Sequence, residues 1–193
     1  MITGIVMASG FSNRMGKDKL LIEINGKKII EWVLEAVKAS NLNEIILIYR
    51  TKEIKRIADS YGIKTVYNPN AHLGQSQSVI LGVENSKSDT YMFFVCDQPF
   101  ISSELINNLI EEYNESPSKI VIPYYQGKIN MPIIFPPDFK EDLLKVEGDK
   151  GGREIIHKNP TRIKKVEVQD EILLKDIDTI EDSEEIRVKN CLG

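Results

Sequence analysis

The sequence predicts an α/β fold with a mostly parallel, twisted sheet that helices cover on both faces. Short β-branched runs alternate along the chain with longer amphipathic stretches, as in successive strand–helix–strand units. Several strand-like runs are apolar throughout, which is typical of strands buried on both faces. The chain has 193 residues and no evident linker, so we expect residues 1–193 to form one Rossmann-like domain.

The elements of the first half follow one another regularly. Residues 2–8 and 44–49 are continuous apolar runs, and residues 64–67 are a shorter run of the same kind, so all three are predicted strands. Residues 28–40 carry apolar side chains at helical spacing, and residues 52–60 form a polar helical stretch.

The second half continues the alternation. After a glycine-containing loop, residues 76–84 resume a helical pattern, and residues 91–96 form the most apolar strand. Ser102 or Ser103 is predicted to cap the next helix. The remaining predicted strands are residues 121–125, 132–135 and 163–168, and the remaining predicted helices are residues 138–146, residues 151–158 and a last one after Ile180.

Composition limits the class of partner. Charged residues make up 28% of the chain and the formal net charge is only -4, so there is no basic excess for nucleic acid or a membrane surface. No apolar stretch is long enough to span a bilayer, and the N-terminus lacks the pattern of a signal peptide. Cys96 and Cys191 stand far apart and are typical of free thiols in a reducing compartment. A cytoplasmic protein is expected.

A glycine-bearing basic loop, ASGFSNRMGKDKLL at residues 8–21, follows the first strand. Its spacing fits neither a Walker A loop, because Gly10 and Gly16 are too far apart, nor the dinucleotide fingerprint G-x-G-x-x-G. A small-residue turn would let backbone amides approach a ligand, and Arg14 and Lys19 would supply positive charge for a polyphosphate. The alternative is a solvated basic loop with a turn glycine.

Two aspartates are possible metal ligands. Asp97 ends an almost wholly apolar strand, where an unpaired carboxylate is costly; it either binds a cation such as Mg²⁺, pairs with a charge, or caps a helix. Asp178, with Asp176 nearby, is a second candidate ligand, and its alternative is the N-terminus of the last helix.

Five segments together resemble one family. VMASGFSNRMGKDKLL resembles the signature L-A-A-G-x-S-x-R-M-G-x-x-K-x-L-L of the MobA-like nucleotidyltransferases, and within them the molybdenum cofactor cytidylyltransferases. The other four are NPNAHLGQSQSVILGV, VCDQPFIS, VEGDKGGREII and KDIDTIED, and they follow in family order across nearly the whole chain. The resemblance implies transfer of a nucleotidyl group from an NTP to a phosphorylated pterin with Mg²⁺, and a transient contact with a molybdoenzyme.

The resemblance also implies roles for individual residues. It implies a nucleotide site formed by Ala8, Ser9, Gly10, Arg14, Lys19, Gly74, Ser76 and Ser78. It implies a pterin-facing part formed by Gln98, Pro99, Asp149 and Arg153. Asp97 would bind the metal with Asp178 as second ligand, and Lys19, Arg14 and Asp97 would carry the catalysis.

The expected donor is CTP. Cytidylyl members tend to carry A-A-G in the first loop and guanylyl members A-G-G, and the small side chain of Ser9 is nearer alanine. The attacking phosphate is already largely ionised at neutral pH, so no general base is needed. The alternatives are a guanylyltransferase for the same cofactor, a transferase acting on a sugar or polyol phosphate, and a non-catalytic carrier of the cofactor.

Overall fold

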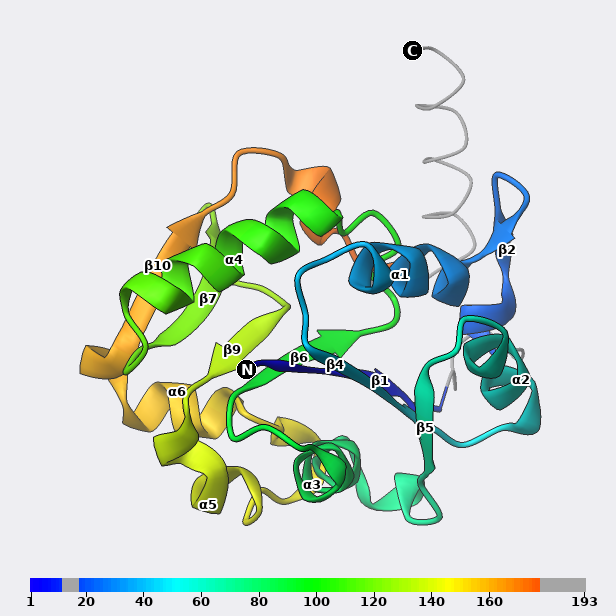
Figure 1. Ribbon diagram of the computed structural model, residues 1–193, viewed down its shortest axis with the longest axis horizontal. Helices are drawn as coiled ribbons and strands as arrows, with labels where there is room; N and C mark the ends of the chain where they lie inside the picture. Colours follow the sequence, from blue (N-terminus) through cyan, green and yellow to red (C-terminus); the bar gives the residue numbers. More distant parts are fainter. Residues whose placement is uncertain (12–17, 178–193) are drawn as a thin grey trace.

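The computed structural model describes residues 1–11 and 18–177, and its centre is a twisted sheet (Figure 1). The strands of this part of the chain follow the order β10-β7-β9-β6-β1-β4-β5, and β8 pairs with β7. Their bounds are β1 Thr3–Ala8, β4 Glu44–Tyr49, β5 Lys64–Tyr67, β6 Tyr91–Val95, β7 Ile120–Tyr125, β8 Lys128–Ile129, β9 Ile133–Phe135 and β10 Ile163–Glu167.

Strand β1 lies at the centre and runs parallel to both of its neighbours. Ala8 is in register with Tyr49 of β4, and Met7 is in register with Val95 of β6. β5 is parallel to β4 and β10 is parallel to β7, which confirms the predicted mostly parallel sheet. β9 is antiparallel to both β6 and β7. Its direction was not predicted, because an apolar run looks the same in either direction.

Helices cover both faces of the sheet, as predicted (Figure 1). Apolar side chains of α1 Ile29–Lys38, α2 Lys52–Ser60 and α4 Ser103–Glu115 join one buried cluster. Those of α3 Ser76–Asn85, α5 Lys140–Leu143 and α6 Arg153–Lys158 join a second cluster on the opposite face. The inner strands β1, β6 and β9 are buried almost throughout, which explains why their sequences are largely apolar, whereas the outer strands β5 and β10 carry exposed lysines.

Most of the predicted elements agree with the structure to within two residues at each end. The helix predicted at residues 138–146 is a 3₁₀ turn, Pro137–Phe139, followed by the short α5. A hairpin of β2 Glu23–Ile24 and β3 Lys27–Lys28 was not predicted, because two-residue strands are too short to show a pattern. The helix predicted after Ile180 lies outside the described residues.

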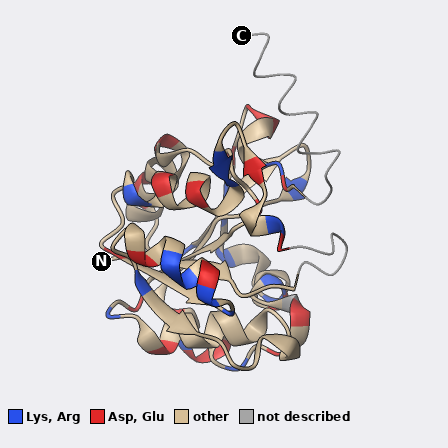
Figure 2. Ribbon diagram, turned by 90° about the vertical axis from the view of Figure 1, so that its right-hand side faces the viewer, with Lys and Arg blue, Asp and Glu red and all other residues tan. Residues whose placement is uncertain are grey.

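Within residues 1–11 and 18–177, no helix is long and apolar enough to cross a membrane. Lysines and arginines are interspersed with acidic residues in the view of Figure 2.

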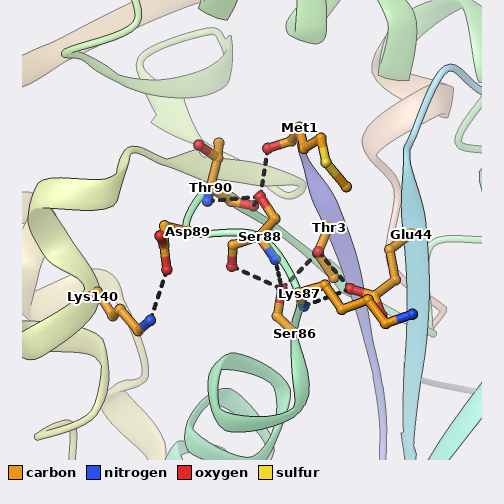
Figure 3. Close-up of polar contacts among 9 residues, drawn as sticks. All are labelled: Met1, Thr3, Glu44, Ser86, Lys87, Ser88, Asp89, Thr90 and Lys140. Atoms are coloured by element: carbon orange, nitrogen blue, oxygen red, sulfur yellow. Dashed lines mark hydrogen bonds and ion pairs between the residues drawn. The ribbon is translucent and has the colours of Figure 1, made fainter.

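Polar side chains gather at the amino-terminal ends of β1 and β4, which are opposite the carboxyl-terminal ends of these strands (Figure 3). Glu44 Oε2 accepts hydrogen bonds from the Thr3 hydroxyl at 3.0 Å and from the Lys87 backbone N–H at 2.9 Å. Burial raises the pKa of Glu44, but these two hydrogen bonds and the charge of Lys64 outweigh it and hold the pKa below its usual value. The ionised carboxylate therefore stabilises this edge.

Replacement of Glu44 tests this contribution. Because the pKa is lowered on folding, the stabilisation is present at neutral pH and is lost as the pH falls below about 4.5 through the folded-state pKa. We expect Glu44→Gln to lower the free energy of unfolding by about 1 kcal/mol at neutral pH, after allowance for solvent screening. Urea unfolding at a series of pH values should show this difference shrinking in acid. The exposed Glu53→Gln is the control, and a pH-independent difference for Glu44→Gln would contradict the assignment.

Another group of buried polar side chains lies at the opposite, carboxyl-terminal ends of the strands, beside a hollow in the molecule.

Candidate functional site

A hollow with a volume of about 490 Å³ opens where β1 and β6 end, and we call it the main hollow. Parallel strands direct their carboxyl ends to one edge, and ligands of open α/β sheets bind there. Ser9 and Gly10 follow β1, and Cys96 and Asp97 follow β6. The residues that line the hollow are Met7, Ser9, Gly10, Phe11, Lys19, Leu20, Ala71, His72, Gly74, Gln75, Ser78, Val95, Cys96, Asp97 and Asp149.

Lys19 and Asp97 meet across this hollow although 78 positions separate them in the chain. The Lys19 Nζ atom lies 2.7 Å from Asp97 Oδ2, and both side chains are largely buried, with 20% and 23% of their surface exposed. Lys19 opens a 3₁₀ turn, Lys19–Leu21, which Asp18 caps by accepting a hydrogen bond from the Leu20 N–H. This local turn fixes where the lysine leaves the backbone, and the fold places its side chain beside Asp97.

The second oxygen of Asp97 has the character of a metal ligand. Oδ1 is buried and has no hydrogen-bond partner among the described residues. A buried carboxylate oxygen without a partner is costly, and oxygen ligands of this kind are the ones that Mg²⁺ and similar hard cations prefer. Within residues 1–11 and 18–177 no group of three acidic, histidine or cysteine side chains surrounds it. Asp97 Oδ1 could therefore serve as one protein ligand of a cation.

The end of the described chain returns to the same place. The Ile177 backbone N–H donates to the Asp97 carbonyl oxygen at 2.8 Å, and Ile177 is fully buried. The predicted second ligand, Asp178, lies outside the described residues, as does Arg14. The described chain thus brings the segment just before Asp178 to Asp97.

Cys96 lies on the floor of the hollow beside Asp97 and is buried. Burial raises the pKa of the Cys96 thiol well above its ordinary value, and the negative charges of Asp97 and Asp18 raise it further against the opposing effect of Lys19. The thiol therefore stays neutral at physiological pH, and it contributes a small apolar surface rather than a nucleophile or a metal ligand.

Three buried polar side chains tie together the segments around the hollow. The Ser9 and Ser78 hydroxyl oxygens are 2.6 Å apart, and the Asn68 amide nitrogen donates to Ser9 Oγ at 3.0 Å. The Asn68 carbonyl oxygen accepts from the Asn70 backbone N–H at 3.0 Å. These residues come from the tip of β1, the tip of β5 and the first turn of α3. We call Ser9, Asn68 and Ser78 the tip cluster.

The turn before α3 also packs closely on the segment that follows α5. Gly74 has φ +103°, and a Cβ atom there would lie 2.5 Å from the Gly148 carbonyl carbon. The next residue, Gln75, donates its backbone N–H to Asp149 Oδ1 at 3.2 Å. Asp149 therefore lines the main hollow and supports the Gly74–Gln75 turn.

Five other predicted residues are not among those that line the main hollow. Ala8, Ser76, Gln98 and Pro99 are buried, and none of the four is among its lining residues. The Gln98 amide nitrogen donates to the Leu174 carbonyl oxygen at 3.1 Å. Arg153 opens α6 and lines a smaller neighbouring cavity instead.

Sequence reasoning did not single out several residues of the site. Phe11 lies at the hollow with 48% of its surface exposed, and the Arg50 guanidinium stacks over its ring at 4.3 Å. Arg50 and Asn68 each follow directly on a parallel strand, so their positions at a strand tip could have indicated them. Gln75 lies in one of the segments that resemble the family, but no feature of the surrounding sequence indicated that it would line the hollow.

The tip cluster predicts a loss of stability when its amide is removed. Asn68→Ala would leave the Asn70 N–H without its acceptor and would take the donor from the two buried hydroxyls. We expect the free energy of unfolding to fall by about 1–3 kcal/mol. Urea unfolding measures this loss, with the exposed Asn70→Ala as the matched control. Equal unfolding midpoints for the two variants would show that the cluster contributes no net stability.

Known proteins share both the sequence pattern and the fold. A protein of Natranaerobius thermophilus named "Probable molybdenum cofactor guanylyltransferase" is 30% identical over 65% of this chain and 62% of its own length, so the chain spans less than two thirds of that relative. A Thermococcus sibiricus protein of the same name is 28% identical over 83% of this chain and 84% of its own. Bacillus subtilis "Purine catabolism protein PucB" is 26% identical over 96% of both chains.

The fold comparison agrees. The solved structure of a nucleotidyl transferase from Methanothermobacter thermautotroptrophicus superposes with a TM-score of 0.84 at 24% identity, and the match covers 98% of this chain and 97% of that one. The family model described as the MobA-like NTP transferase domain matches residues 4–164, which include Lys19, Asp97 and the tip cluster. The chain therefore belongs to the family of proteins with a MobA-like NTP transferase domain.

Proposed function

We propose that this protein transfers a guanylyl group from GTP to the phosphate of the pterin of the molybdenum cofactor and releases pyrophosphate. The observation that carries the proposal is the Lys19–Asp97 pair in the main hollow, with one Asp97 oxygen buried and unpartnered among the described residues. The names of two relatives point to the same cofactor and the same nucleotide.

The donor nucleotide would occupy the main hollow. The Ala8-Ser9-Gly10 backbone at the tip of β1 would approach the base and phosphates, and Lys19 and Arg14 would bind the triphosphate. Gly74, in the turn before α3, and Ser76 and Ser78, in the first turn of α3, would lie on the side of the nucleoside. The volume of about 490 Å³ is within the range of small-molecule sites.

Asp97 would hold a divalent cation through Oδ1, and Asp178 is the proposed second ligand. The buried, unpartnered oxygen supports this role, and we propose Mg²⁺ as the ion. When bound, the ion would reduce the negative charge on the phosphates.

The chemical step needs positioning and charge neutralisation. An oxygen of the acceptor phosphate forms a bond to the α-phosphorus of the donor, and the bond from that phosphorus to the oxygen bridging to the β-phosphate breaks. The electron pair leaves with pyrophosphate. The acceptor phosphate has a second pKa of about 6, so it is already an anion and needs no base. Lys19, and Arg14 with it, would stabilise the negative charge that builds up on the leaving group.

The acceptor would bind on the side of β6, β9 and α6. Asp149, Gln98 and Pro99 would shape this side, and Arg153 would attract the anionic acceptor. The support is their arrangement around the β6 tip and the Gly74–Gln75 turn. We propose that residues 1–193 work as one domain in this reaction, in the cytoplasm, and pass the product to a molybdoenzyme.

CTP is the second candidate donor. The residue after Ala8 is Ser9 rather than glycine, and this pattern favours CTP. In the structure the Ser9 hydroxyl bonds to Ser78 and Asn68 within the tip cluster. The names of the relatives favour GTP.

A donor panel tests the function. The protein is incubated with molybdopterin, Mg²⁺ and one of GTP, CTP, ATP or UTP, and mass spectrometry detects the dinucleotide while pyrophosphate is measured. We expect the guanine dinucleotide to form at the highest rate. A cytosine dinucleotide in its place would select the second candidate, and binding without any dinucleotide would identify a non-catalytic carrier.

A charge-neutral variant tests the role of Asp97. Asp97→Asn keeps the size of the side chain but removes the charge that faces Lys19, so we expect turnover to fall by about 10²- to 10³-fold. Steady-state rates of pyrophosphate release measure the loss.

The chain offers a matched control at the other end of the sheet. Asp89 forms an ion pair of the same length, 2.7 Å, with Lys140 (Figure 3). Asp89→Asn should leave turnover unchanged. The assignment of Asp97 is wrong if both variants retain the rate of the unchanged protein.

A further inference from the structure

A separate cleft of about 470 Å³ lies at the edge of the sheet, where β4 and β5 end beside α2 (Figure 1). Tyr49 is the last residue of β4, Tyr67 is the last residue of β5, and Arg50 follows β4 directly. None of the residues that line this cleft lines the main hollow. We call it the α2 cleft, and its lining residues are Tyr49, Arg50, Lys52, Lys55, Arg56, Asp59 and Tyr67.

The lining of the α2 cleft is strongly basic. Four of its residues are lysine or arginine and one is acidic, although the chain as a whole has a formal net charge of -4. The acidic residue, Asp59, forms an ion pair with Lys55 one turn away on α2. Within the part of the chain that the structure describes, Arg50, Lys52 and Arg56 have no ion-pair partner. The cleft therefore holds an excess of positive charge that no carboxylate of the described residues neutralises.

Arg50 also carries a hydrogen-bond donor that lacks an acceptor. Its Nε atom is buried and has no partner among the described residues. The guanidinium stacks over the Phe11 ring, with 4.3 Å between Arg50 Cζ and the ring centroid, and Phe11 lines the main hollow. A buried donor without an acceptor costs free energy, so Arg50 would gain a hydrogen bond by turning toward an anion in the cleft.

The donors of the α2 cleft suit phosphate oxygens. Guanidinium and ammonium groups bind such oxygens through charge-assisted hydrogen bonds, and the phenols of Tyr49 and Tyr67 can donate further ones. Three cations without a carboxylate partner match the charge of a diphosphate group better than that of a single carboxylate. The volume of about 470 Å³ is within the range of small-molecule sites.

Two aromatic rings lie at the strand ends that line the cleft. The rings of Tyr49 and Tyr67 pack with their centroids 5.6 Å apart and their planes at 49° to each other. Tyr67 keeps 53% of its surface exposed. Its ring therefore offers a stacking surface beside the cations, and a base attached to the diphosphate would use it.

We propose that the α2 cleft is a second anion site, which binds a diphosphate group either as free pyrophosphate or as part of a nucleotide. Lys52 and Arg56 bind the phosphate oxygens from α2, and Arg50 binds them from the end of β4. The site is separate from the nucleotide site of the proposed function. It requires neither the transfer reaction nor a metal ion, so it is tested by binding alone.

Two exposed lysines allow a matched test. Lys52 lines the cleft at the start of α2, and Lys38, at the end of α1, does not. Replacement of either by glutamine changes the net charge equally. Calorimetric titration with pyrophosphate in magnesium-free buffer measures the affinity, and thermal melting confirms that each variant is folded. We expect Lys52→Gln to weaken binding by about tenfold, because a charge-assisted hydrogen bond is lost, and Lys38→Gln to leave it unchanged. Equal affinities of the two variants would overturn the proposal.

Asp59 provides a test with the opposite sign. Asp59→Asn removes the acidic side chain of the lining and releases Lys55 from its ion pair. Because exposed ion pairs are weak, we expect the affinity for pyrophosphate to rise by about threefold. An unchanged or lower affinity would contradict a cleft in which Lys55 and Asp59 face the anion.

A variant of the main hollow separates the two sites. Lys19→Gln removes the lysine of the main hollow, and we expect binding that depends on Lys52 to persist in it. Binding of pyrophosphate that depends on Lys19 and is insensitive to Lys52→Gln would place the anion in the main hollow and overturn the second site.

The source of the diphosphate is then identified in the Lys19→Gln protein. GDP replaces pyrophosphate as the probe, and Tyr67→Ala removes the exposed ring. If Tyr67→Ala weakens the binding of GDP and leaves that of pyrophosphate unchanged, the ligand of the cleft is a nucleotide whose base stacks on Tyr67. If GDP binds no more tightly than pyrophosphate and Tyr67→Ala affects neither, the ligand is free pyrophosphate. Failure of both probes to bind in a Lys52-dependent way would overturn the site.

Discussion

The parallel pairing of β1 with strands on both sides is the constraint on which the site depends. β4 and β6 lie in register with β1, so the residues that follow each strand emerge at one edge of the sheet. Ser9 and Asp97 line the main hollow for this reason, although the chain separates them widely. Both faces of the sheet are buried under helices, which keeps the strand tips fixed relative to one another.

Two groups of polar side chains lie at this edge, and they differ in whether a hydrogen-bonding atom is left without a partner among the described residues. The tip cluster uses its hydrogen-bonding groups internally, so it stabilises the arrangement of β1, β5 and α3 rather than reading a ligand. Asp97 engages Lys19 through one oxygen and keeps the other without a partner in the described chain. The first arrangement suits a scaffold, and the second suits a site that exchanges partners when a nucleotide and a cation bind.

The segment from Gly148 to Gly152 packs closely on two neighbouring parts of the molecule. It supports the Gly74–Gln75 turn beside the main hollow through Asp149, and Gly152 lies against the Phe135 ring. Glycines allow this close approach, because added Cβ atoms at Gly74 or Gly152 would collide with the backbone or an aromatic ring.

The sequence by itself determined the alternation of strands and helices and the loop after β1, and it indicated Lys19 and Asp97 as candidate site residues. Apolar runs and helical spacing are local, so they can be read without the fold, and strands 44–49 and 64–67 and helix 52–60 agree residue by residue. Only the tertiary structure decided the reversed direction of β9, the tip cluster, and the small cavity beside Gln75. These features arise from contacts between segments far apart in the chain, and no local pattern specifies which distant side chain fills a given space.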